Sequence, residues 1–277
     1  MTVTLTTTEH PRQSPFGNFI YPVLSRRSAG LSLGVNVNVD KECSFSCVYC
    51  QVDRSPAGLQ KKPLLPDLET ILQEVEDFLK GGHELADKTL KDIAIAGDGE
   101  PTQVAFLPEL LLGLLGLLKK YKKDNAKLIL FTNGSGLTKP SLQPALTALT
   151  EAGGEIWFKF DFWDEDSFMQ INRPKVKFQT IIQHLIEIGG KFPLVLQSCL
   201  FEGQTEGLIE GQINFDQDKY LRLAQDFLEA GVTFKKIQLY SIARMPTEAW
   251  VKAMSPEKLE QVAKALRQIT NCPVEVY

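Results

Sequence analysis

The sequence predicts an α/β protein in which strands and helices alternate. β-rich apolar segments alternate with longer segments of helical periodicity along the 277 residues, a pattern typical of βαβ units on a parallel sheet. No composition break, long Pro/Gly/Ser linker or short repeat interrupts this alternation. We therefore expect a single domain over residues 1–277, with a polar N-terminal arm at 1–24 and the β/α part at 25–277.

The pattern places the elements in order. The expected strands are Leu33–Val39, Lys91–Ala96, Lys127–Thr132, Glu155–Asp161, Leu194–Phe201 and Phe234–Tyr240, with a short one at Pro273–Tyr277. The expected helices are Leu68–Lys80, Leu107–Lys123, Ser141–Ala152, Phe178–Ile188, Asp218–Ala230 and Pro256–Ile269. Periodicity alone does not separate a doubly wound sheet from an incomplete barrel. In both, ligands gather at the C-terminal ends of the strands.

Composition limits the class of protein and its partners. The hydrophobic fraction of 43% and charged fraction of 23% are those of a globular protein, which excludes disordered and fibrous classes. A net charge of −4 gives no support for an RNA partner, although it leaves RNA binding open. The longest apolar run, Leu110–Leu118, is too short to span a bilayer, so we expect no membrane partner.

The cysteines indicate a reducing compartment. The chain has five, an odd number, and three of them fall within eight residues, which is poor geometry for a disulfide framework. The first eight residues lack the charged and apolar regions of a secretion signal. We therefore expect a cytoplasmic protein.

The cysteine loop, residues 43–50, follows the first predicted strand and so lies on the ligand side of the sheet. Cys43, Cys47 and Cys50 can wrap one compact inorganic centre, and thiolate is the standard ligand of iron–sulfur clusters. Three ligands for four irons leave one iron open to a substrate or cofactor. The alternative is a zinc site, which needs a fourth Cys or His, and none follows nearby.

The spacing Cys-x3-Cys-x2-Cys, with an aromatic residue directly before the last cysteine, resembles the signature of the radical S-adenosylmethionine (SAM) superfamily. The resemblance implies a partial (β/α)6 TIM-like barrel, one 4Fe-4S cluster and SAM, whose amine and carboxylate chelate the open iron. Reductive cleavage of SAM then gives a 5′-deoxyadenosyl radical that abstracts hydrogen from a substrate. It also implies an external electron donor such as flavodoxin or ferredoxin, and a place near adenine for Tyr49.

A glycine-rich turn follows the second predicted strand. Gly97 and Gly99 permit close backbone approach, although such a strand-to-helix turn is often only a turn. The segment resembles the "GGE" motif of the superfamily, and this implies that Glu100 contacts the SAM ammonium group. Asp98 departs from the motif, because a glycine is typical there.

Two further strand ends carry polar candidates. Asn133, after the third predicted strand, could offer an amide to a ribose or simply form an Asx-type turn. Lys159 and Asp161 share one face at the end of the fourth strand. The resemblance implies that polar groups at this strand end contact the SAM ribose or carboxylate, and Asp161 is the better candidate of the two.

Arg173 and Cys199 complete the candidate set. Arg173 lies in an Ile-Asn-Arg-Pro segment that resembles one branch of the superfamily; it could pair with the SAM carboxylate, and a surface salt bridge is the alternative. Gln197 and Cys199 share a face of the fifth strand. Cys199 could donate a hydrogen atom to a substrate radical, or it could be a small core residue.

The closest branch consists of stand-alone radical SAM proteins related to the enzymes that form the wyosine base of tRNA. Unlike the wyosine enzymes, this chain has no cysteine before Cys43. We expect a radical SAM enzyme of the iron–sulfur oxidoreductase or transferase type that acts on a small molecule or peptide. A tRNA nucleoside is the alternative substrate. A non-catalytic iron–sulfur electron-transfer protein, with a fourth protein ligand to its cluster, is the alternative class.

Overall fold

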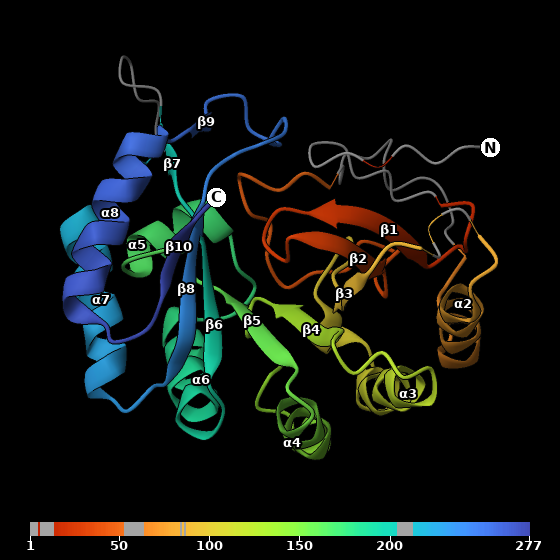
Figure 1. Cartoon of the computed structure of the whole chain (residues 1–277). Helices are drawn as coiled ribbons and strands as arrows, with labels where there is room; N and C mark the ends of the chain where they lie inside the picture. Colours follow the sequence, from red (N-terminus) through yellow and green to blue (C-terminus); the bar gives the residue numbers. More distant parts are fainter. Residues whose placement is uncertain (1–4, 6–13, 53–63, 84, 86, 204–212) are drawn as a thin grey trace. The chain divides into compact units, whose positions relative to one another are not determined.

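The computed structural model describes residues 5, 14–52, 64–83, 85, 87–203 and 213–277, which form two compact units. The first contains the described residues within 1–43, 54–132 and 139–156, and the second contains those within 44–53, 133–138 and 157–277. Figure 1 labels the elements of both. None of the described helices is both long and apolar enough to cross a membrane. The single-domain organisation stays a prediction.

The first unit is built on a sheet with the strand order β1-β2-β3-β4. Its strands are β1 (Ile20–Ser25), β2 (Gly30–Val35), β3 (Leu90–Ile95) and β4 (Lys127–Thr132). β1 pairs antiparallel with β2, and the β2–β3 and β3–β4 pairs are parallel, as βα units require. Its helices are α2 (Leu68–Lys80), α3 (Leu107–Lys120) and α4 (Gln143–Glu151), with 3₁₀ turns η1 (Pro101–Gln103) and η2 (Pro140–Leu142). In Figure 1, α3 lies between α2 and α4 and packs against both.

The second unit carries the strand order β5-β6-β8-β10, and β8 pairs in parallel with both β6 and β10. These strands are β5 (Glu155–Lys159), which begins in the first unit, β6 (Leu194–Cys199), β8 (Phe234–Tyr240) and β10 (Val274–Val276). Two short strands, β7 (Phe201–Glu202) and β9 (Lys252–Ala253), pair separately. Its helices are α5 (Glu165–Ser167), α6 (Phe178–Lys191), α7 (Gln217–Glu229) and α8 (Pro256–Ile269), with a π-turn η3 (Phe168–Asn172). α7 and α8 lie side by side (Figure 1).

The alternation of predicted strands and helices is confirmed, and the boundaries differ for local reasons. The first predicted strand ends early, at Val35, because the Asn36 side chain accepts a hydrogen bond from the Asn38 amide and turns the chain. The predicted second helix ends at Lys120, just before Lys122, which has a positive φ of 52°. β1 lies within the expected N-terminal arm except for its last residue, Ser25, and is not among the predicted strands.

A chain of buried aromatic rings fills the second unit and reaches the cysteine loop. Phe162 packs edge-on against Phe160 and Phe168, with ring centroids 5.2 Å and 4.8 Å apart. Phe168 in turn packs against Phe45, whose ring is 5.3 Å away. Such ring pairs stabilise a fold beyond the area they bury. The aromatic core therefore holds one residue of the cysteine loop directly.

The two glycines Gly154 and Gly116 predict opposite responses to alanine. A Cβ on Gly154 would lie 2.4 Å from Leu149 and 2.8 Å from the Leu128 carbonyl oxygen, whereas one on Gly116, within α3, would meet nothing within 4 Å. We expect Gly154→Ala to lower the free energy of unfolding by about 1–3 kcal/mol. Gly116→Ala should raise it by about 0.5–1 kcal/mol because alanine favours the helix. Urea unfolding measures both, and equal effects would contradict the packing at Gly154.

Candidate functional site

The cysteine loop passes from the first unit to the second directly after Cys43. Cys43, Cys47 and Cys50 are all half-buried. The surroundings of Cys43 are therefore a feature of the first unit, and those of Cys47 and Cys50 are a feature of the second. Within neither unit do the described residues gather three or more His, Cys, Asp or Glu side chains into a metal-ligand group.

In the first unit, the glycine-rich turn at 97–100 contacts Glu42, the residue before Cys43. The Glu100 amide donates to the Glu42 carbonyl oxygen at 3.0 Å. A Cβ on Gly99 would lie 1.8 Å from that same oxygen, so only glycine fits there. Asp98, the departure from the motif, accepts a hydrogen bond from the Asn36 side chain at 2.9 Å. The predicted glycine turn thus positions the start of the cysteine loop.

The buried carboxylate of Glu100 has local partners. Its Oε1 accepts hydrogen bonds from the Thr102 amide at 3.1 Å and the Thr102 hydroxyl at 2.7 Å, and one from the Thr132 hydroxyl at 2.6 Å. Glu100 is the N-cap of η1 and is only 2% exposed. These bonds fix the carboxylate between the ends of β3 and β4, where the sequence predicts a ligand contact.

In the second unit, the backbone of the cysteine loop pairs with the end of η3. The amides of Ser46 and Val48 donate to the carbonyl oxygens of Asn172 and Ile171, each at 2.9 Å. Arg173 then turns the chain in a left-handed conformation with a φ of 42°. The Lys175 amide donates back to the carbonyl oxygen of Ser44 at 2.8 Å. Three backbone bonds therefore hold the first half of the loop on one side.

The segment after β8 holds the second half of the loop. The Thr247 amide donates to the Cys50 carbonyl oxygen at 3.0 Å, and the Glu248 amide donates to the Val48 carbonyl oxygen at 3.2 Å. Sequence reasoning missed these residues, because no motif or periodicity marks this segment. The loop is thus held between two segments that are more than seventy residues apart in the chain.

The Cys47 thiol lies against the end of η3. Its sulfur accepts a hydrogen bond from the Asn172 side-chain nitrogen at 3.4 Å. Burial raises the pKa of the Cys47 thiol to about 12; the Asn172 bond opposes this shift, and the Asp161 charge adds to it. Sequence reasoning missed Asn172 as a partner of the thiol, although its place in the Ile-Asn-Arg-Pro segment could have indicated it.

Asp161, just beyond β5, joins the cysteine loop to two strand ends. It is 2% exposed and accepts hydrogen bonds from the Tyr49 hydroxyl and from the Cys199 amide at the end of β6. The Lys159 ammonium group lies 3.5 Å from its carboxylate and donates to the Tyr240 hydroxyl. Tyr49, Lys159, Asp161 and Cys199, all predicted candidates, are therefore brought together.

The pKa values in this group reflect burial and mutual charge. Burial opposes the charge on Lys159, but the Asp161 carboxylate outweighs it, with help from Tyr240, so the pKa of Lys159 is raised. Burial and the same carboxylate raise the pKa of Tyr49. At neutral pH the group therefore contains the Lys159 ammonium ion and the neutral Tyr49 phenol.

Asn133 forms the Asx-type turn that is one of its two predicted roles. Its side-chain oxygen accepts from the Ser135 amide at 3.0 Å, and its side-chain nitrogen donates to the Ser44 hydroxyl at 3.0 Å. Gly134 follows with a φ of 83°, and a Cβ there would lie 2.3 Å from the ring of Phe158. The turn therefore contacts the cysteine loop through Ser44.

The remaining candidates lie on the surface and in the core. Arg173 forms an ion pair with Glu248 at 2.5 Å, the salt bridge that is its alternative role. Cys199 is buried at the end of β6, and Gln197 on the same strand donates to the Gln238 side chain at 2.8 Å. The Gln197 side-chain oxygen is buried and has no hydrogen-bond partner among the residues that the structure describes.

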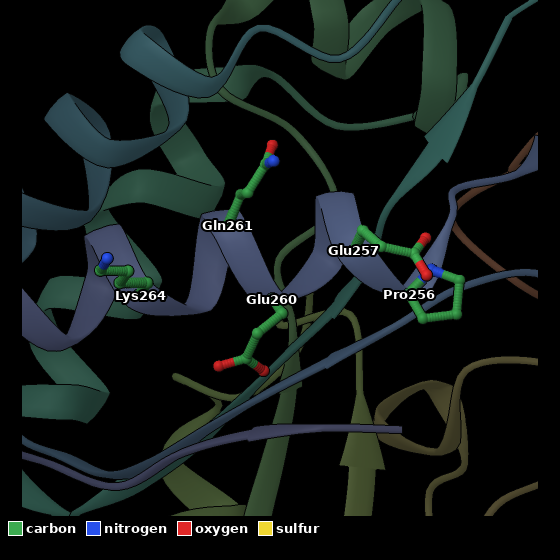
Figure 2. Close-up of a pocket in the computed structure, with 5 residues that line it drawn as sticks. All are labelled: Pro256, Glu257, Glu260, Gln261 and Lys264. Carbon is green, nitrogen blue, oxygen red and sulfur yellow. The ribbon is translucent and has the colours of Figure 1, made fainter.

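A shallow hollow on α8 contains none of these candidates. Figure 2 shows its five lining residues, all from the exposed side of one helix: Pro256, Glu257, Glu260, Gln261 and Lys264. A single helix surface without convergent polar groups does not form a ligand site. The candidate site therefore stays with the cysteine loop and the strand ends.

The buried thiol of Cys47 predicts a slow reaction with alkylating agents. Because burial raises its pKa to about 12 from the ordinary 9.0, its thiolate fraction at pH 8 is lower by about a thousandfold in the folded, cluster-free protein. Iodoacetamide labelling of Cys47, followed by mass spectrometry, should be slower than in urea-unfolded protein by about that factor. Equal rates would show that the fold does not raise the pKa of this thiol.

The Lys159–Asp161 pair predicts strong energetic coupling. Asp161→Asn leaves a largely buried ammonium ion without its carboxylate, so the free energy of unfolding should fall by about 3–5 kcal/mol. The double variant Asp161→Asn/Lys159→Met should lose at least about 1 kcal/mol less free energy of unfolding than the two single variants lose together. The exposed Lys80–Asp77 pair, 2.8 Å apart, is the control and should couple by under about 0.5 kcal/mol. Similar coupling in both cycles, measured by urea unfolding, would contradict the burial of the first pair.

Comparisons with known proteins find relatives in sequence and in fold. No family model matches it. A UPF0026 protein of Helicobacter pylori strain J99 is 26% identical over 242 residues, which are 86% of this chain and 70% of that protein. The structure of TYW1 with a bound lysine-pyruvate adduct has a TM-score of 0.54 at 20% identity, covering 87% of this chain and 74% of the other. Spore photoproduct lyase complexed with dinucleoside spore photoproduct has a TM-score of 0.55 at 12% identity, covering 98% and 79%.

The two solved structures establish the fold. The chain has their mixed α/β fold, so the predicted partial TIM-like barrel is confirmed and the doubly wound alternative is wrong. The expected cofactors, one 4Fe-4S cluster and SAM, are those that these enzymes use. The sequence likeness to the UPF0026 protein and the shared fold agree with the resemblance to the radical SAM superfamily that the cysteine loop predicts.

Proposed function

We propose that this chain is a radical SAM enzyme whose cluster is ligated by Cys43, Cys47 and Cys50. The observation that carries the proposal is the cysteine loop itself, which has the superfamily spacing and is held from two sides by backbone hydrogen bonds. The fold shared with radical SAM enzymes supports it. When bound, the cluster supplies the electron that cleaves SAM to methionine and a 5′-deoxyadenosyl radical.

The surroundings of Cys47 fit a thiolate ligand in a dry site. The Asn172 side chain donates a hydrogen bond to the sulfur, and a donor in this place stabilises the negative charge of a metal-bound thiolate. Phe45 and Val48 are buried and keep water from the loop. Burial favours the neutral thiol when no metal is present, whereas a cation bound to the sulfur offsets that cost and releases the proton.

Seven residues are proposed to bind SAM. Gly97 and Gly99 permit close backbone approach, and Glu100 would bind the ammonium group of the methionyl moiety. Tyr49 would contact the adenine, and Asn133 and Asp161 would bind the ribose. Arg173 would exchange its ion pair with Glu248 for the SAM carboxylate, which suits a guanidinium group.

The substrate is proposed to be a small molecule or a peptide. Cys199 is buried beside Asp161, and its thiol hydrogen could quench a substrate radical, which would leave a thiyl radical that a later electron and proton must reduce. Because radical SAM enzymes share the initiation step and differ in their substrates, these residues support the reaction type more strongly than the substrate class.

The decisive experiment is anaerobic reconstitution with iron and sulfide, followed by dithionite and SAM. We expect cluster absorbance and formation of 5′-deoxyadenosine. Cys47→Ala should abolish both, because the cluster loses a ligand, whereas the control Cys272→Ala, which changes a cysteine near β10, should retain both. A cluster without 5′-deoxyadenosine would instead favour an electron-transfer protein. Retention of cluster and cleavage in Cys47→Ala would exclude the cysteine loop as the site.

A further inference from the structure

Three cations lie on the segment that follows η3 and is hydrogen-bonded to the cysteine loop. Arg173, Lys175 and Lys177, called here the cationic strip, are all exposed and fall within five residues. Arg173 pairs with Glu248, whereas Lys175 and Lys177 have no ion-pair partner in the part of the chain that the structure describes. The strip therefore presents uncompensated positive charge on a protein whose net charge is −4.

The strip is joined to the cysteine loop by the main chain. The Lys175 amide donates to the Ser44 carbonyl oxygen, and the residue before Arg173 accepts from the Ser46 amide. These bonds place the exposed cations directly on the outside of the loop that carries Cys47 and Cys50. A molecule that binds the strip would therefore lie next to the proposed cluster.

An exposed apolar side chain accompanies the charges. Met245 is 87% exposed, the largest fraction among the exposed large apolar residues of the described chain. It lies on the segment in which Thr247 binds the Cys50 backbone and Glu248 binds Arg173. Protein interfaces typically combine a flexible or aromatic apolar contact with a surrounding charged rim. Charge and exposed methionine therefore occur on two segments that both hold the cysteine loop.

We propose that the two lysines of the cationic strip, Lys175 and Lys177, and Met245 form the docking surface for an acidic, low-potential electron-carrier protein of the flavodoxin or ferredoxin type. The inference rests on the proposed function, since an enzyme of this kind must receive one electron for each cleavage of SAM. The reduced carrier loses one electron, the cluster site gains it, and no atom is transferred. Electron transfer weakens steeply with distance, which favours a surface on the cysteine loop itself.

Charge complementarity selects an acidic protein over an RNA. Two acidic proteins repel one another, so a carrier needs a local cationic patch to approach the correct face. Two unpaired lysines beside the cysteine loop form such a patch. An RNA-binding surface usually extends over a larger basic face, and a net charge of −4 gives no indication of one. RNA binding at the strip is therefore the competing outcome of the test.

The test compares two sources of electrons in the reconstituted enzyme. In Lys175→Glu/Lys177→Glu, 5′-deoxyadenosine formation driven by flavodoxin and its reductase at low salt should fall at least about tenfold. Dithionite-driven formation should be unchanged, because neither lysine belongs to the proposed cluster or SAM sites. The difference in flavodoxin-driven rate between the wild type and this variant should shrink as ionic strength rises, because salt screens the charges. Lys175→Gln/Lys177→Gln should give an intermediate loss.

A matched variant and a binding measurement complete the test. Lys88→Glu/Lys264→Glu makes the same change of charge at exposed lysines elsewhere and should retain the flavodoxin-driven rate; Figure 2 shows the exposed Lys264. Carbodiimide cross-linking to flavodoxin, mapped by mass spectrometry, should join its carboxylates to Lys175 or Lys177. Equal losses in both variants, an equal loss with dithionite, or cross-links only at other lysines would overturn the docking surface.

Two further outcomes have separate meanings. If Lys175→Glu/Lys177→Glu keeps the flavodoxin-driven rate but loses affinity for tRNA in fluorescence anisotropy, the strip binds a polyanion and the proposal is wrong. If wild-type enzyme makes no 5′-deoxyadenosine even with dithionite, the proposed function fails. The cross-linking result would then still report on the docking surface independently.

Discussion

The backbone hydrogen bonds on the cysteine loop are the constraint on which the candidate site depends. A loop with three potential metal ligands binds a metal more tightly when it is already held in one conformation, because ordering it at the moment of binding costs conformational entropy. Here the amides of Ser46 and Val48 pair with the end of η3, and the carbonyl of Cys50 pairs with Thr247. Phe45 adds an apolar anchor in the aromatic core.

The same segments also carry the chemistry around the loop. The residue whose carbonyl holds Ser46 is Asn172, and its side chain donates to the Cys47 sulfur. One residue therefore fixes both the backbone of the loop and the orientation of a ligand. Asp161 has a similar double role, since it accepts from the Tyr49 hydroxyl and from the backbone at the end of β6. Structural and proposed functional roles share the same contacts in this unit.

The sequence predicts the periodic part of the structure and the local part of the site. Alternating apolar patterns locate β3, β4 and α2 closely, because each is defined by burial of its own residues. The short spacing of Cys43, Cys47 and Cys50 is equally local. β1 escapes prediction because Pro22 interrupts its pattern, which is tolerated in an edge strand. The contacts of Thr247 and Asn172 with the cysteine loop are not predictable from the sequence, because they depend on the tertiary fold.

The charges of the second unit separate into two environments with different physical consequences. Lys159 is largely buried beside Asp161, so its charge is compensated locally and acts over a short distance. Lys175 and Lys177 stay in solvent, where their field is screened by salt but reaches an approaching protein at low ionic strength. The buried charges of Lys159 and Asp161, called the inner charges, suit a small bound cofactor because they act over a short distance. The outer charges suit the capture of a large partner, and substitution of either set can test its role without removing the other.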